Sequence, residues 1–139
     1  MSIYLGIDIG AVSIKAALLA DEAQARALLE PNNSLLRKGC SLEGGGGGSS
    51  WTVLAAPYRR IQGRPFEAVR RLVADLLTCV DKQQIAGLMF TGSGSDLIAG
   101  VLQSPRCNEF QALARAVAMV RPDARTVFEL GGETSKFLR

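Results

Sequence analysis

Two acidic side chains stand beside glycines at the ends of apolar segments, an arrangement suited to binding phosphate and a metal ion. Asp8 lies within Gly6-Ile-Asp-Ile-Gly10, and Glu129 begins Glu129-Leu-Gly-Gly-Glu133. A third apolar segment ends in Thr91-Gly-Ser-Gly94. Glycine lets backbone amides approach an anion closely, and a carboxylate at a strand end can hold a hydrated divalent cation. One such turn is common by chance, but three in one chain favour phosphate and Mg²⁺ chemistry.

Strands and helices must bring these turns together, and the apolar residues predict where they lie. Apolar runs predict strands over residues 3–9, 13–19, 25–29, 51–56, 85–90 and 126–130. Pro65 begins a long amphipathic helix. Ser95 is expected to cap a short helix that reaches about residue 102, and Asn108 to cap another that ends before Pro122.

Two of these helices carry an apolar stripe that we expect to be buried. On the first helix the stripe consists of Phe66, Val69, Leu72, Val73, Leu76, Leu77 and Val80. On the last helix it consists of Phe110, Leu113, Val117 and Val120. An antiparallel meander followed by two crossover units predicts an α/β fold, with a mixed sheet and helices on both faces. That succession is the ribonuclease-H-like topology.

We expect a single domain over residues 1–139. Ligands meet sheets of this kind at strand ends, so the three turns are expected at one edge of the sheet. Residues 31–50 include five consecutive glycines, Gly44 to Gly48, which pack nothing and permit almost any conformation. The sequence therefore predicts a flexible inserted loop there.

The composition is that of a globular chain that binds neither nucleic acid nor membrane. Hydrophobic residues make up 47% of the 139 residues, and the net charge of +3 comes from scattered basic residues. Histidine is absent and the three cysteines form no CxxC pair, so we expect no zinc or iron–sulfur site within the chain. No stretch reaches the ~20 apolar residues of a membrane span. Free thiols favour a cytoplasmic protein.

Several of these motifs resemble those of a known family. Gly6-Ile-Asp-Ile-Gly10 followed by Lys15 is similar to the first phosphate motif of the actin, hexokinase and heat-shock-chaperone ATPase superfamily. The segment Arg125-Thr-Val-Phe-Glu-Leu-Gly-Gly-Glu-Thr-Ser-Lys136 resembles the second phosphate motif of one branch. That branch comprises the ATP-dependent activators of 2-hydroxyacyl-CoA dehydratases and the ATPase subunits of benzoyl-CoA reductases. Asn108-Glu109 and Pro122-Asp123-Ala-Arg-Thr126 resemble the segment before that motif, so the resemblance covers most of the chain.

The resemblance implies a role for each matching residue in the N-terminal half of an actin-like ATPase. Asp8 and Glu129 would be the catalytic acids that face Mg²⁺, and Asp8 would orient an attacking water. Lys136, like Lys15, matches a family lysine. The residues that bind the cofactor would be Gly10, Ala11, Val12, Ser13, Lys15, Gly92, Gly131, Gly132 and Glu133.

The same resemblance implies the cofactors and partners of a longer protein. ATP and Mg²⁺ would bind between this half and a C-terminal half beyond Arg139. That second half would carry the adenosine site and the cysteines of a subunit-bridging iron–sulfur cluster. ATP hydrolysis would drive an electron into a CoA-ester dehydratase or reductase, and homodimer formation is left open. The 139 residues alone are expected to bind ATP poorly.

The chain departs from the family pattern at several site positions. Ala11 and Val12 stand where relatives carry hydroxyl residues. Glu129 and Thr134 replace aspartates of the second motif, and Ala112-Leu113 replaces a Cys-His pair. Because phosphoryl transfer depends on positioned charge, losing several such contacts would cost orders of magnitude in rate.

Three alternative functions therefore stay open. The chain could be a degenerate ATPase half that serves as a scaffold or dimerisation module. It could be a ribonuclease-H-like two-metal nuclease that uses Asp8, Glu129 and Asp96. It could also be a relative of sugar or acetate kinases, whose substrate is chosen by the other half of the fold.

Overall fold

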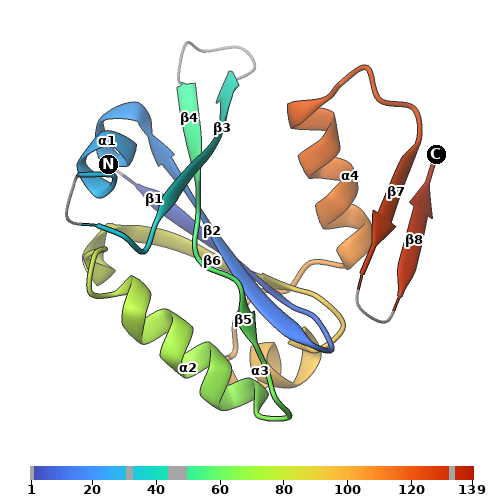
Figure 1. Ribbon diagram of the computed structural model, residues 1–139, viewed down its shortest axis with the longest axis horizontal. Helices are drawn as coiled ribbons and strands as arrows, with labels where there is room; N and C mark the ends of the chain where they lie inside the picture. Colours follow the sequence, from blue (N-terminus) through green and yellow to red (C-terminus); the bar gives the residue numbers. More distant parts are fainter. Residues whose placement is uncertain (1, 31–32, 44–49, 132–133) are drawn as a thin grey trace.

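A mixed sheet lies at the centre of the chain in the computed structural model, which describes residues 2–30, 33–43, 50–131 and 134–139 (Figure 1). The strands follow the order β3-β4-β2-β1-β6, and β5 pairs with β2. They are β1 (Ile3–Ile9), β2 (Ser13–Asp21), β3 (Arg37–Glu43), β4 (Ser50–Ala55), β5 (Arg59–Arg60) and β6 (Ile85–Thr91). Two further strands, β7 (Val127–Leu130) and β8 (Ser135–Leu138), form a separate two-stranded sheet.

Four α-helices accompany the strands in the described part of the chain. They are α1 (Glu22–Leu28), α2 (Pro65–Leu76), α3 (Ser95–Leu102) and α4 (Glu109–Val120). Figure 1 shows α2 and α3 on one side of the sheet, and α4 with the β7–β8 hairpin on the other. The predicted α/β class with a mixed sheet is confirmed. Among the described helices, none has the length and apolar character needed to cross a membrane.

The hydrophobic core lies on the face of the sheet that α2 covers. Side chains of a strand alternate between faces, and β1 buries every second one: Ile3, Leu5, Ile7 and Ile9. Strand β1 lies between β2, with which it pairs antiparallel, and β6, with which it pairs in parallel. The close-packed middle of the sheet therefore fixes where β1 and β6 end.

The stripe predicted on α2 is confirmed in its centre and wrong at one margin. Val69, Leu72 and Leu76 are buried, whereas Phe66 and Leu77 are exposed. Successive helical residues are turned by about 100°, which places the two exposed residues together at one side of the stripe. The core reaches only the middle of that apolar face.

The opposite face of the sheet is only partly covered. Tyr4 and Met89 are exposed there, and Tyr4 packs edge-to-face on Trp51 with ring centroids 5.9 Å apart. Helix α4 lies on this side but has no buried residue, and Phe110 and Val120 are each 48% exposed. The buried stripe predicted for α4 is therefore wrong: Phe110 and Val120 are exposed, and Leu113 and Val117 are only partly buried. Ala112, Leu113 and Ala116, in the middle of the helix, line a hollow together with Asp8 and Thr91 of the sheet.

Two segments before β4 differ from the prediction. Residues 25–29, predicted as a strand, fall in and just after α1. Asp21 caps this helix by accepting a hydrogen bond from the Gln24 amide at 2.8 Å, and strong helix formers fill it. Residues 37–43, predicted as flexible loop, form β3 because pairing with β4 satisfies their backbone groups. The glycines at 44–48 lie outside the described residues.

The last predicted strand exists but pairs differently. Residues 126–130 are expected to extend the main sheet, whereas β7 pairs antiparallel with β8. Phe128 and Phe137 lie opposite each other in this hairpin, with ring centroids 5.0 Å apart. A strand that follows within a few residues is easier to pair with than a distant sheet edge, because the loop it closes is short. Of the three strands predicted to end in glycine turns, only β1 and β6 therefore end at the same edge of the main sheet.

The same substitution at a buried and at an exposed leucine of the predicted stripe tests how α2 packs on the core. Leu72 is 0% exposed and Leu77 is 42% exposed, so the same Leu→Ala change removes very different contacts. We expect Leu72→Ala to lower the free energy of unfolding by about 2–5 kcal/mol. Leu77→Ala should lower it by less than about 1 kcal/mol. Urea denaturation measures both, and equal losses would contradict the packing described here.

Candidate functional site

The turn between β1 and β2 is tight and presents two residues at its tip. The Gly10 amide donates a hydrogen bond to the Ser13 carbonyl oxygen at 2.9 Å. Ala11 and Val12 lie between them and are exposed, while Ser13 is buried at the start of β2. A phosphate approaching this turn would first meet the backbone of Ala11 and Val12.

The loop between β6 and α3 packs directly on the end of β1. Gly92 has a φ of +100°, and a Cβ added there would lie 2.5 Å from Asp8 Oδ1 and still closer to the Ile9 carbonyl oxygen. The Gly94 amide donates to that carbonyl at 2.8 Å. Ser95 is the first residue of α3 rather than its predicted cap, and its buried hydroxyl donates to the Gly92 carbonyl at 2.6 Å. These contacts pack the loop against the backbone at the end of β1, next to Asp8.

Two lysines pair with three carboxylates beside the turn. Lys15 Nζ donates to Asp8 Oδ2 at 3.2 Å, across the β1–β2 pair. Lys136 Nζ, on β8, donates to Glu129 Oε2 at 2.6 Å and lies 3.0 Å from Glu109 Oε2 of α4. The second group joins the hairpin to α4, because its three members come from β7, β8 and α4.

These groups line one cleft of about 370 Å³. Eight predicted site residues line it: Asp8, Gly10, Ala11, Val12, Ser13, Lys15, Glu129 and Gly131. Gly92 does not, since it lies in the loop behind Asp8. Gly132 and Glu133 lie outside the described residues. The first and second predicted motifs thus face each other although β7 is not in the main sheet.

Further residues line the cleft that the site prediction does not include. They are Tyr58, Ser93, Glu109, Leu130, Thr134 and Lys136. A signal for Glu109 exists, because it follows the confirmed cap Asn108, whose Oδ1 accepts from the Phe110 amide at 2.8 Å. Acidic residues are favoured in the first turn of a helix for electrostatic reasons alone, so the signal is easily taken as structural.

Lys136 is the most enclosed charge of the cleft, with 11% of its side chain exposed. Its hydrogen bond to Glu129 raises the pKa of the ammonium above the ordinary lysine value. Burial opposes this shift, and Glu109 reinforces it. The protonated form is therefore held firmly between the two carboxylates.

Asp8 and Glu129 fit a metal ion that arrives with phosphate better than a resident one. In the described part of the chain, no group of three or more His, Cys, Asp or Glu side chains is placed to hold a metal. Mg²⁺ is commonly bound by one or two carboxylates together with substrate phosphates. Thr91 Oγ1 is buried without a hydrogen-bond partner among the described residues, and Thr91 lines an adjoining hollow with both acids. That hydroxyl is a free group for a ligand or a water.

The two glycine amides expected to face phosphate are already engaged. Gly10 donates to Ser13, and Gly131 donates in the same way to the Thr134 carbonyl oxygen at 2.8 Å. Each of these bonds closes a turn. The glycines therefore shape the two turns rather than offering their own N–H groups.

Asp96, the third acid of the nuclease alternative, is held elsewhere. Its Oδ1 lies 2.5 Å from Arg106 Nε, and it does not line the cleft that contains Asp8 and Glu129. A two-metal centre built from these three acids is not assembled by this arrangement.

Comparison with known proteins adds no assignment. A scan against protein-family models, a search of curated proteins and a search of solved structures each return no match to this chain.

The tight fit of Gly92 predicts a sharp difference between two glycines. Gly92→Ala would overlap the end of β1 in a backbone conformation that costs other residues about 1–3 kcal/mol by itself. We expect a loss of stability greater than about 2 kcal/mol, with altered amide signals at Ile9. Gly100→Ala, in α3 with open space around it, should instead stabilise the chain by up to about 1 kcal/mol. Thermal denaturation compares them, and equal shifts would refute the close contact.

The Lys136 group predicts a pH dependence. Because its pKa is higher in the folded state, the stability it provides is fully present below the ordinary value of 10.5 and is lost as pH rises through the folded value. The difference in unfolding free energy between the native chain and Lys136→Gln should therefore be constant from neutral pH up to that value and shrink above it. Lys15→Gln, which breaks a more exposed pair, should cost less than about 1 kcal/mol. A Lys136 difference unchanged to about pH 12 would contradict the raised pKa.

Proposed function

We propose that this chain is the phosphate-binding N-terminal half of an actin-like ATPase of the activase type. One observation carries the proposal: the β1–β2 turn and the β7–β8 hairpin, remote in sequence, line one cleft with Asp8 and Glu129. A strand-end carboxylate, a tight glycine turn and a second glycine turn opposite are the parts that a nucleotide phosphate site needs.

The finer fold assignment belongs to the same proposal. The β2–β1–β6 core, with β4 beside β2, has the strand directions expected of a ribonuclease-H-like sheet. In that topology the segment of β7 would extend the sheet beside β6. We infer that β7 forms the hairpin seen here because it pairs with the adjacent β8 instead of with β6.

Each residue of the cleft has a definite task in this proposal. Asp8, at the supported end of β1, would accept a hydrogen bond from a water or metal-bound water. Lys15 would hold the Asp8 carboxylate in place. Ala11 and Val12 would present their backbone to the phosphates. Mg²⁺, when bound with ATP, would supply the positive charge that shields the phosphate oxygens from the carboxylates.

The wider role follows from the resemblance and is proposed with it. A C-terminal half of the same fold would complete the nucleotide site and supply the iron–sulfur cluster. The complete cytoplasmic protein would use ATP hydrolysis to drive an electron into a CoA-ester dehydratase or reductase. The cleft supports this only at the level of phosphate and magnesium, since the described residues that line it include no cysteine.

A non-catalytic scaffold is the second candidate, and the ion pairs favour it. Asp8 and Glu129 each have a lysine partner, so their charges are already balanced without a metal. A structural network of this kind needs no ligand. The two candidates differ in whether Mg-ATP competes with the lysines for these acids.

Titration of the chain with Mg-ATP, followed by amide NMR, separates them. We expect millimolar Mg-ATP to shift the amide signals of Ala11, Val12 and Gly131, because these residues line the cleft. Asp8→Asn should weaken binding by about tenfold or more, since it removes a charge next to the metal. ATP with a chelator in place of Mg²⁺ should bind more weakly than Mg-ATP.

Asp96→Asn is the matched control, because Asp96 is an exposed acid outside the cleft. It should leave the affinity for Mg-ATP unchanged. If millimolar Mg-ATP shifts none of the cleft amides, the scaffold function is the correct one.

A further inference from the structure

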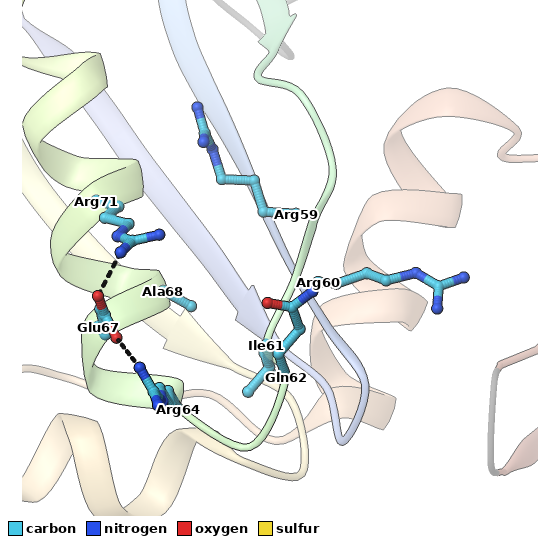
Figure 2. A pocket seen from close by; sticks show the side chains of 8 residues that line it. All are labelled: Arg59, Arg60, Ile61, Gln62, Arg64, Glu67, Ala68 and Arg71. Carbon is cyan, nitrogen blue, oxygen red and sulfur yellow. Dashed lines mark hydrogen bonds and ion pairs between the residues drawn. The ribbon is translucent and has the colours of Figure 1, made fainter.

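A second pocket lies between β5 and the beginning of α2, and it is basic. It has a volume of about 630 Å³ and is lined by four arginines and one glutamate (Figure 2). The nucleotide cleft differs in charge, because three carboxylates there face two lysines. This pocket therefore carries a surplus of positive charge, whereas the site proposed for ATP does not.

Three guanidinium groups are available to this pocket. Arg64 and Arg71 share Glu67, whose two carboxylate oxygens lie 3.5 and 2.5 Å from them. Figure 2 shows both side chains directed at Glu67, whereas Arg60 extends away from this group. Each guanidinium carries five N–H donors, so one shared carboxylate leaves most of them without a charged acceptor.

Arg59 adds a donor that the protein does not satisfy. Its terminal nitrogen pairs with Asp75 of α2 at 2.5 Å, but its Nε is buried without a hydrogen-bond partner among the described residues. A buried N–H group left unpaired is destabilising. Arg59 therefore adds an unpaired donor beside the pocket, in addition to the surplus of positive charge.

The start of α2 reinforces the preference for an anion. Arg64 occupies the N-cap position and makes no side-chain capping hydrogen bond to the helix. The N-terminal end of a helix of this length carries partial positive charge from its free amides. Helix and arginines therefore act in the same direction.

We propose that this pocket binds a small phosphorylated molecule, with the phosphate held by Arg59, Arg64 and Arg71. Arginine forks match phosphate oxygens in charge and geometry. The volume falls in the range of about 300–1,000 Å³ typical of small-molecule sites. Nucleic acid is disfavoured as the ligand because the described residues that line the pocket include no aromatic side chain to stack on a base. The site is separate from the ATP cleft and does not depend on the function proposed for it.

Titration with inorganic pyrophosphate, used as the probe, tests the proposal in the whole 139-residue chain. We expect saturable amide shifts at Gln62, Gly63 and Ala68. The double variant Arg64→Gln/Arg71→Gln should raise Kd about tenfold or more, since each arginine contributes charge-assisted hydrogen bonds. Both side chains are exposed, so the core is unaltered and the variant folds.

The control is Arg70→Gln, an exposed arginine of α2 that does not line the pocket. It should leave Kd within about twofold of the native chain, because a screened surface charge contributes little. Equal weakening by the control and the double variant would mean non-specific charge attraction and overturn the proposal. So would shifts confined to residues 10–15, or tighter binding of a single-stranded oligonucleotide than of pyrophosphate at the same ionic strength.

Discussion

The ion pairs of Lys136 join the β7–β8 hairpin to α4. The β7–β8 hairpin contributes little to the core, and Phe128 on its outer face is 71% exposed. Its inner face presents Glu129 and Lys136, which are directly opposite in the hairpin register, to Glu109 of α4. With so little apolar burial, the charged network sets where the hairpin lies. The position of Glu129 relative to Asp8 follows from that network.

The same network sets what the cleft can accept. Three carboxylates against two lysines leave a negative balance, which repels a bare polyphosphate. A divalent cation reverses this balance, so phosphate binding here requires a metal that enters with it. When no cation is present, the two lysines offset the repulsion between the carboxylates. A site of this kind can be a resting form of an ATPase or a permanent structural bridge. The two differ in how readily Asp8 and Glu129 exchange their lysine partners for a metal ion.

Local sequence patterns predicted the elements well where the pattern and the packing agree. Apolar runs identified β1, β2, β4 and β6, and Pro65 and Asn108 marked the starts of α2 and α4. Apolar spacing alone could not show that residues 25–29 are helical, because a short apolar run fits either structure until Asp21 is recognised as a cap.

Other errors came from contacts between distant segments. Phe110 and Val120 have the spacing of a buried stripe, yet both are exposed, because α4 covers the sheet without burying any of its own residues. Either β8 or β6 can pair with β7, and the spacing of apolar residues does not indicate which of the two does. The candidate site was predicted from two glycine turns, and eight of its residues do line one cleft. The ion-paired Glu109 and the basic pocket escaped prediction because their residues converge only after folding.

Strand β5 connects the two sites through its backbone. It is two residues long and pairs with the first residues of β2, and the Ile61 amide just after it donates to the Val12 carbonyl oxygen at 2.9 Å. Arg59 extends toward α2 and the basic pocket, whereas Val12 lies at the tip of the turn that lines the cleft. The segment is fixed on both sides, because Ile61 is buried in the core and Arg59 is paired with Asp75 of α2. One short strand therefore borders the basic pocket and, through the Val12 carbonyl, also supports the turn that lines the cleft.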